Sequence, residues 1–151
     1  GVYRRFNIHI NMPRVAYIDD YAHHPTELKA TIESVKRLYP DREVIGVFQP
    51  HLYSRTRDFA DDFAAVLSEL DEVVLLPIYP AREAPIAGVT SEWLMEKIQR
   101  RTIDKVSVMD KKEVVAYLRE WVASADTAGV VLTLGAGDID TLIQELTNTI
   151  L

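Results

Sequence analysis

The stretch "YIDDYAHHPTELKA", residues 17–30, decides the fold because it joins the end of an apolar run to the start of a helix. The apolar run Val15–Ile18 is typical of a buried strand. Pro25 suits the first turn of a helix, and Glu27 follows where a carboxylate interacts favourably with the helix dipole. The stretch therefore predicts one strand–loop–helix unit with a polar loop at its centre.

The same unit recurs along the chain. Further apolar runs predict strands at Val44–Phe48, Val73–Leu76, Val106–Met109 and Val130–Leu134. Apolar residues at helical spacing follow Pro25, Ser54, Thr90, Asp110 and Gly137. This order predicts an α/β fold of the doubly wound type, with a mostly parallel sheet flanked by helices. Asn7–Ile10 is expected to add a short edge strand.

Length and composition exclude several classes of protein. The 151 residues suit one domain, and 48% hydrophobic with 26% charged residues is an ordinary globular composition. A net charge of −6 disfavours a general nucleic-acid binder. There is no apolar run of about 20 residues and no signal peptide, so a cytosolic location fits. Cysteine is absent, which excludes a thiolate nucleophile. The first residue is not Met, and we expect a fragment or an excised domain.

Polar clusters follow the predicted strands. They read "DDYAHHP" at 19–25, "QPHLYSRTR" at 49–57, "PIYPARE" at 77–83 and "GAGD" at 135–138. In an open α/β sheet, ligands bind outside the carboxyl ends of the strands. The clusters are therefore expected on the functional edge, and the long loop 77–88 is expected to be a mobile functional loop.

Two arginines fall in the first turn of the helix predicted after Ser54, where the helix dipole disfavours cations. Arg55 and Arg57 are favoured there if they face an anion such as a phosphate or a carboxylate. The alternative for Arg57 is that it is solvated or pairs with Asp58 or Asp61.

The histidines do not have the spacing of a helical metal motif. His23 and His24 are neighbours, which disfavours a zinc site held by protein ligands. His24 either caps the helix or lies in the core. His51, on a different loop of the same edge, could reach His23. His9 lies outside every cluster and is expected to be structural or exposed.

Two further features leave alternatives open. Asp19 and Asp20 point to opposite sides of an extended chain, so only one is expected to face a ligand. The glycines of "TLGAGD" suit either an anion site at a helix start or a tight turn, and the turn is favoured for Gly135. Neither GxGxxG nor the phosphate loop GxxxxGK[ST] occurs.

Four long motifs resemble, in order, the carboxy-terminal domain of the Mur ligase family. They are "DDYAHHPTE", "FQPHLYSRT", "LPIYPAREAPIAGVTSE" and "LTLGAGDI". The opening "GVYRRF" is similar to the join after the family's central ATPase domain. The resemblance implies that residues 1–10 end the central domain or link it, and that residues 11–151 form a Rossmann-like C-terminal domain.

The resemblance also implies an activity. The family's enzymes are three-domain, ATP-dependent amide-bond ligases of peptidoglycan precursor synthesis in the bacterial cytoplasm. The motifs are most similar to those of members that join L-alanine to UDP-N-acetylmuramate through an acyl phosphate. ATP and Mg²⁺ are the cofactors implied for the full-length enzyme, and its own N-terminal and central domains are the implied partners. This sequence lacks the phosphate loop and, with it, the expected Mg²⁺ ligands, so the resemblance implies that it is inactive alone.

Site residues carry over position by position. Asp20 matches the aspartate expected to bind the ATP ribose, and Arg5 matches an arginine that reaches the ATP phosphates. The L-alanine site falls on Tyr21, His23, His51 and Arg55. Arg55 is the best candidate for the carboxylate. Leu52 departs from relatives that carry a second arginine after the histidine, so carboxylate binding would lean on Arg55. No catalytic nucleophile and no metal ligand is expected here.

Two rival readings remain. A sister ligase that recycles peptides onto UDP-N-acetylmuramate has similar motifs, but Phe is expected there in place of Tyr21, without an arginine four residues after the histidine of "QPH". A stand-alone nucleotide-binding or regulatory module of flavodoxin-like shape is the other rival. The four long motifs argue against it.

Overall fold

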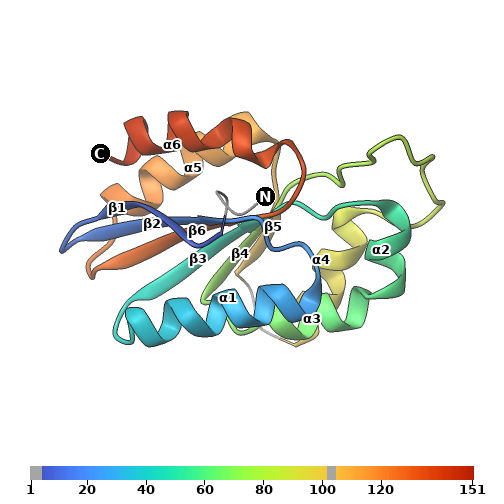
Figure 1. Cartoon of the computed structure of the whole chain (residues 1–151), viewed down its shortest axis with the longest axis horizontal. Coiled ribbons are helices and arrows are strands. Elements are labelled where there is room, and N and C mark those ends of the chain that lie inside the picture. The colour runs from blue at the N-terminus through green and yellow to red at the C-terminus, as the bar shows by residue number, and fades with distance from the viewer. Residues whose placement is uncertain (1–4, 102–104) are drawn as a thin grey trace.

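The computed structural model describes residues 5–101 and 105–151, which build a six-stranded sheet covered by helices on both faces (Figure 1). The strands are β1 Asn7–Asn11, β2 Val15–Asp20, β3 Glu43–Phe48, β4 Glu72–Leu75, β5 Val106–Val108 and β6 Gly129–Leu134. The helices are α1 Pro25–Leu38, α2 Tyr53–Asp58, α3 Ala60–Leu67, α4 Ser91–Gln99, α5 Lys111–Ala123, the 3₁₀ helix η2 Asp138–Leu142 and α6 Ile143–Ile150.

The order of the strands is β1-β2-β6-β3-β4-β5. The edge strand β1 is antiparallel to β2, and all other pairs are parallel. The last strand, β6, therefore lies between β2 and β3, with Gly129 in register with both Val15 and Glu43. These pairings confirm the predicted α/β fold, its mostly parallel sheet and its edge strand.

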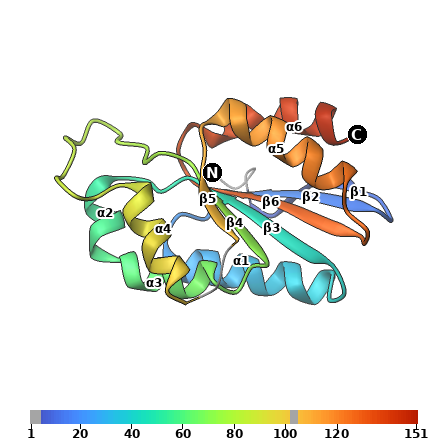
Figure 2. The same ribbon diagram turned by 180° about the vertical axis from the view of Figure 1, so that it is seen from behind.

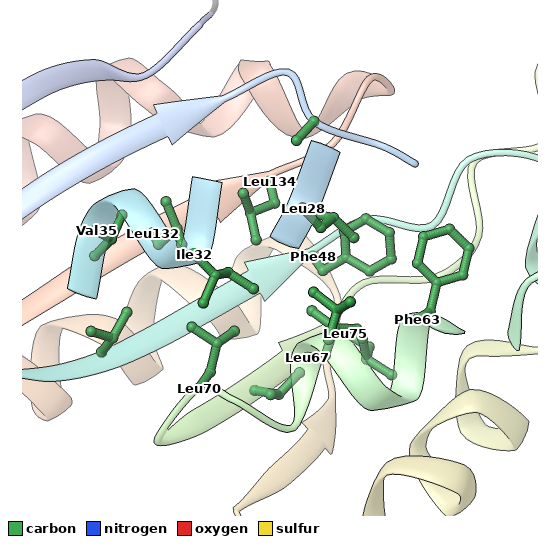
Figure 3. Packing of buried hydrophobic residues seen from close by; sticks show 14 of the residues in the cluster. Leu28, Ile32, Val35, Phe48, Phe63, Leu67, Leu70, Leu75, Leu132 and Leu134 are labelled. Carbon is green, nitrogen blue, oxygen red and sulfur yellow. The ribbon is translucent and has the colours of Figure 1, made fainter. Parts of the chain in front are cut away.

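Each face of the sheet has its own apolar layer. Figure 1 shows α5 and α6 on one face and α1 and α3 on the other. On β6, Val130 and Leu132 pack with α1 and α3, whereas Val131 packs with α5 and α6, as the alternation of side chains along a strand requires. Figure 3 shows part of the first layer, where Leu28 and Ile32 of α1 lie over the sheet. Because both faces are covered, the central strands are apolar throughout.

Two helix starts follow from local sequence. At α1, the His24 side chain accepts a hydrogen bond from the Thr26 N–H, and Glu27 bonds back to the His24 N–H. Asp110 and Glu113 form the same reciprocal box at α5. Of the two alternatives for His24, capping is the one that applies.

Two predicted helices differ from expectation. The helix expected from Ser54 onward breaks at Phe59, whose φ of −116° and ψ of 19° separate α2 from α3. The break lets the Phe59 ring pack edge-on against His24, with ring centroids 4.8 Å apart. The segment after Gly137 starts as the tighter helix η2 before α6 begins. No described helix is long and apolar enough to cross a membrane.

The strand order places a switch point at the centre of the sheet. β2 and β3 lead into α1 and α2, but β6 between them leads into η2 and α6 on the opposite face. In sheets of this type, ligands bind where neighbouring strands diverge to opposite faces. A ligand site is therefore expected at the carboxyl ends of β2, β6 and β3.

Candidate functional site

Asp20, at the carboxyl end of β2, is 8% exposed and binds its own chain at three points. Its Oδ1 accepts a hydrogen bond from the Ala22 N–H at 2.9 Å. Its Oδ2 accepts one from the Thr31 hydroxyl at 3.0 Å and one from the Phe6 N–H at 3.2 Å. The carboxylate thus ties the segment before β1 and helix α1 to the end of β2.

A pocket of about 190 Å³ lies beside this carboxylate. Its lining includes Arg5, Asp20, Tyr21, Glu27 and Thr31. The structure therefore brings together Arg5 and Asp20, the two residues that the sequence predicts for ATP. It also places Tyr21 at the border of this pocket.

Asp19 faces the other way and is fully buried. Its Oδ1 accepts a hydrogen bond from the Thr133 hydroxyl at 2.7 Å, and the Tyr17 hydroxyl lies 3.0 Å from the same Thr133 oxygen. His9 packs on this network, with its ring 5.3 Å from that of Tyr17. Of the two aspartates, it is Asp20 that lines the pocket.

A second cluster is centred on His51, after β3. The Arg55 guanidinium donates a hydrogen bond to His51 Nδ1 at 3.0 Å. Because a guanidinium can only donate, Nδ1 carries no proton and Nε2 of the neutral ring is the N–H. Burial lowers the pKa of His51, and the positive charge of Arg55 and the nearby His23 lower it further. His51 therefore presents an N–H donor beside a permanent cation.

His23 donates from the other ring nitrogen. Its Nδ1 lies 3.0 Å from the backbone oxygen of Tyr21, which can only accept, so Nδ1 carries a proton, and in the neutral ring Nε2 is an acceptor. The same Nδ1 lies 3.5 Å from a carboxylate oxygen of Glu27. The rings of His23 and His51 are 5.9 Å apart, and Tyr21 stands edge-on to His23 at 5.2 Å. The structure thus brings together all four residues that the sequence predicts for L-alanine, and it places a donor group next to an acceptor group.

Glu27 remains ionised beside these imidazoles. Burial raises the pKa of this carboxyl, but hydrogen bonds from the His23 and His24 N–H groups, together with the nearby imidazoles, outweigh burial and leave it below its ordinary value. Glu27 therefore places a negative charge on the α1 side of the cluster.

The sequence did not identify Tyr79, which comes from the loop after β4. Its ring stacks on His51, with centroids 5.7 Å and planes 19° apart. Its N–H donates to the Pro50 oxygen, and its own oxygen accepts from the Leu52 N–H, both at 2.8 Å. The sequence did contain one signal for a functional role of Tyr79, which is an aromatic residue between Pro77 and Pro80 after a predicted strand. Only the structure shows which histidine it contacts.

Leu52 has a strained backbone. Its φ of 71° lies in the left-handed region, which a branched side chain rarely adopts. Its oxygen accepts hydrogen bonds from the N–H and the hydroxyl of Thr56, at 3.2 and 2.8 Å. Strain held by such bonds is typical of segments that position functional groups, here His51 and Arg55 on either side.

The glycines after β6 serve as a turn. A Cβ at Gly137 would come within 2.4 Å of Gln49 Oε1 and 2.7 Å of the Tyr79 ring. Gln49 Oε1 accepts the Ile139 N–H at 2.9 Å, and Gln49 Nε2 donates to Asp138 at 2.7 Å. A side chain of the protein thus satisfies an N–H at this helix start, which supports the turn alternative over the anion site.

One of the remaining alternatives, that for Arg57, is also decided. Arg57 forms an exposed ion pair with Asp58 at 2.8 Å, so the pairing alternative holds for this arginine. Within residues 5–101 and 105–151, no group of three or more histidines and carboxylates could hold a metal ion.

The fold and the site together define a Rossmann-like α/β domain whose strand ends present a guanidinium and two imidazoles. Residues 4–137 match the family model described as "Mur ligase, glutamate ligase domain". The chain belongs to this family.

Named relatives agree with the family. The chain is 48% identical over 146 residues to the UDP-N-acetylmuramate–L-alanine ligase of Flavobacterium psychrophilum, covering 97% of the chain and 31% of that protein. It is 52% identical over 144 residues to the ligase of the same name from Parabacteroides distasonis, covering 95% of the chain and 29% of that protein. The chain therefore spans about a third of the length of these relatives.

Solved structures show the same fold. The UDP-N-acetylmuramate-alanine ligase of Thermotoga maritima matches with a TM-score of 0.71 at 25% identity, over 96% of this chain and 29% of that chain. A domain assigned to a UDP-N-acetylmuramate:L-alanyl-γ-D-glutamyl-diaminopimelate ligase of Haemophilus ducreyi matches with a TM-score of 0.67 at 19% identity, over 97% of this chain and 100% of that chain. The second match shows that a domain of this fold crystallises by itself.

Proposed function

We propose that this chain is the amino-acid-binding C-terminal domain of an ATP-dependent ligase that joins L-alanine to UDP-N-acetylmuramate. The observation that carries the proposal is the contact of Arg55 with His51 beside His23, at the switch point of the sheet. Relatives about 50% identical to the chain bear the name of this ligase. In this proposal residues 1–10 remain the end of the central domain or the linker, although residues 7–11 form β1.

The cluster suits the two ends of a free amino acid. A carboxylate accepts hydrogen bonds from Arg55 and from the N–H of His51 Nε2, since both groups can only donate in the observed arrangement. The ammonium group of the same molecule can donate to Nε2 of the neutral His23 ring and give it a proton, and the resulting amine can attack the acyl phosphate, form the amide and release inorganic phosphate. Tyr21 lies next to His23 at the edge of this amino-acid site. The domain thus positions the nucleophilic amine and supplies charge stabilisation.

The pocket next to Asp20 suits the ribose of ATP. A carboxylate offers roughly four acceptor positions, and three hydrogen bonds from the protein leave room for about one more, from a ribose hydroxyl. Arg5 is exposed at the same pocket and can reach phosphate oxygens. When bound, Mg²⁺ neutralises phosphate charge, and we assign its protein ligands to the central domain of the full-length enzyme.

The two rivals have less support. Ligases that act on L-alanyl-γ-D-glutamyl-diaminopimelate match this chain at 19% identity, which shows a shared fold. The chain also keeps Tyr21 and the arginine four residues after His51, as expected for an L-alanine ligase. A stand-alone module would not require the matching pair of donor and acceptor groups.

The test is phosphate release from ATP by the full-length enzyme that carries this domain, with UDP-N-acetylmuramate present. We expect turnover to depend on L-alanine and not on the peptide L-alanyl-γ-D-glutamyl-diaminopimelate. Turnover with the peptide alone would favour the recycling ligase, and turnover with neither would favour the module. The isolated 151-residue chain should release no phosphate with L-alanine, because it has no phosphate loop.

A further inference from the structure

The long loop after β4 passes over α2 (Figure 2). Glu83, near the middle of this loop, accepts a hydrogen bond from the Ser54 N–H at 2.9 Å and a second from the Ser54 hydroxyl. The bond from the Ser54 hydroxyl and the backbone N–H groups of Ser54 and Tyr53 lower the pKa of Glu83. An ionised carboxylate thus sits at the start of α2, supplied by a residue 29 positions away.

Helix α2 lacks the local features that normally stabilise a helix start. Leu52 at its N-cap has no side-chain oxygen to accept the first N–H groups, and the first turn contains no acidic residue. Two arginines, Arg55 and Arg57, lie within the six residues of this helix. The missing acidic residue and the two arginines both disfavour this helix start, since the helix dipole there favours a negative charge. Glu83 supplies the missing acceptor and the missing charge.

The same loop also contacts residues 50–52, which precede α2. Tyr79 stacks on His51 and exchanges backbone hydrogen bonds with Pro50 and Leu52. Glu83 holds Ser54, the neighbour of Arg55. The strained Leu52 lies between these two points of attachment. The direction of the Arg55 side chain is therefore set by the loop after β4 as well as by its own helix.

We propose that Glu83 is a positioning residue that, by holding Ser54, aims the Arg55 guanidinium at His51 and at the carboxylate of the incoming amino acid. The second half of this statement rests on the proposed function of the cluster. Glu83 makes two hydrogen bonds to Ser54, and it acts on Arg55 through this residue.

The experiment compares Glu83→Gln and Glu83→Ala with Glu92→Gln. Glu92 is an exposed carboxylate in the first turn of α4 and serves as the matched control. Glutamine keeps the size of the side chain and one acceptor oxygen but removes the charge and the second acceptor. Kinetics use the full-length ligase, and ring nitrogen NMR uses the isolated domain, since a domain of this fold crystallises alone.

We expect Glu83→Ala to raise the KM for L-alanine by about 10-fold, the effect of one charge-assisted hydrogen bond, and Glu83→Gln to raise it less. The KM for ATP should change by less than about twofold, within the usual effect of surface changes. In the domain, His51 should lose its single tautomer, because Nδ1 no longer has a fixed donor. Glu92→Gln should change none of these quantities.

Two results would overturn the proposal. One is an unchanged KM for L-alanine in Glu83→Ala when Arg55→Ala raises it strongly. The other is an equal rise in the KM values for L-alanine and ATP together with an unchanged His51 tautomer, which would show a general effect on stability. If Glu83→Ala does not fold, the same KM values and the His51 tautomer are measured in Glu83→Gln and Ser54→Ala and compared with Glu92→Gln. If Arg55→Ala itself leaves L-alanine kinetics unchanged, the proposed function of the cluster fails, whatever Glu83 does to the His51 tautomer.

Discussion

Two neighbouring strand–helix junctions of this domain are built in opposite ways. At the β2–α1 junction, the helix start is capped by His24 and Glu27, residues within three positions of each other. At the β3–α2 junction, the helix start follows a strained Leu52, has no side-chain cap of its own and takes its carboxylate from Glu83. The first junction is stabilised by local contacts and the second by a distant loop.

The two junctions differ in how many of their polar groups remain available to a ligand. Asp20 at the first junction binds mostly its own chain, whereas His51 and Arg55 at the second junction bind each other and leave an N–H and a guanidinium for a ligand. A junction that depends on a separate loop can change its geometry when the loop changes, while the sheet stays intact. We therefore expect mutations of His51 and Arg55 to alter substrate use with little effect on folding, whereas mutations of Asp20 should alter folding as well as ATP use.

The largest effect is expected from Arg55→Ala. Loss of this guanidinium should weaken L-alanine use by about 2–5 kcal/mol, because the carboxylate would be desolvated without its partner. Arg55→Lys should restore only part of the loss, since an ammonium lacks the planar fork. The control is Arg57→Ala, which removes an exposed, ion-paired arginine of the same helix. Steady-state kinetics of the full-length enzyme should vary L-alanine and ATP separately. A collapse of ATP dependence with intact L-alanine dependence would move Arg55 to a phosphate site.

The next effect concerns the first junction. Asp20→Ala leaves the Ala22 and Phe6 N–H groups without their acceptor, at about 1–3 kcal/mol of unfolding free energy for each buried group that stays unpaired. Thr31→Val removes one of the three bonds and should cost less. Urea unfolding of the domain measures both. In the full-length enzyme, Asp20→Asn should raise the KM for ATP more than that for L-alanine. Unchanged values would limit Asp20 to the structural role.

A third substitution tests the contact between Gly137, in the turn after β6, and Tyr79, which stacks on His51. Gly137→Ala would place a methyl group within 2.7 Å of the Tyr79 ring and displace that ring from His51. The φ of Gly137 is −84°, outside the left-handed region, and overpacking alone is expected to cost about 1–3 kcal/mol. Thermal unfolding and the His51 ring signals should change together. A loss of stability with unaltered His51 signals would show that the glycine supports the turn alone.

The smallest effect is the titration of His51. Burial, Arg55 and His23 lower its pKa, so the folded domain binds fewer protons than the unfolded chain just below the ordinary value of 6.5. Stability attributable to this group is present above 6.5 and is lost as the pH falls toward the folded pKa. Glu27, Tyr21 and Glu83 also lie near the cluster, so the titration should be followed at the His51 ring by NMR.

The control for that titration is Arg55→Gln. It should raise the His51 midpoint toward 6.5 without reaching it, because burial remains. A wild-type midpoint at or above 6.5 would contradict the arrangement of Arg55 and His51 described above.

The same two junctions explain how much the sequence predicts. The apolar runs predict all five parallel strands, and Pro25 with Glu27 predicts the start of α1. The strand period predicts that the two aspartates point apart, but only the pairing of β2 with β6 decides that Asp19 is buried against Thr133. Tyr79 and Glu83 could not be assigned because their partners are almost 30 residues away. The break at Phe59 was missed because the apolar helical spacing continues through it.

The position of β6 has a consequence for biosynthesis. Asp19 and its partner Thr133 are 114 residues apart in the chain, so β2 and β3 are made long before the strand that joins them. During translation, the edges of β2 and β3 that pair with β6 remain unpaired until residues 129–134 emerge from the ribosome. Pairings across such separations form slowly, because the loop must close before the contacts stabilise it. The site at the carboxyl ends of β2, β6 and β3 therefore forms late in folding, and a chain that stalls before β6 would expose two sheet edges prone to aggregation.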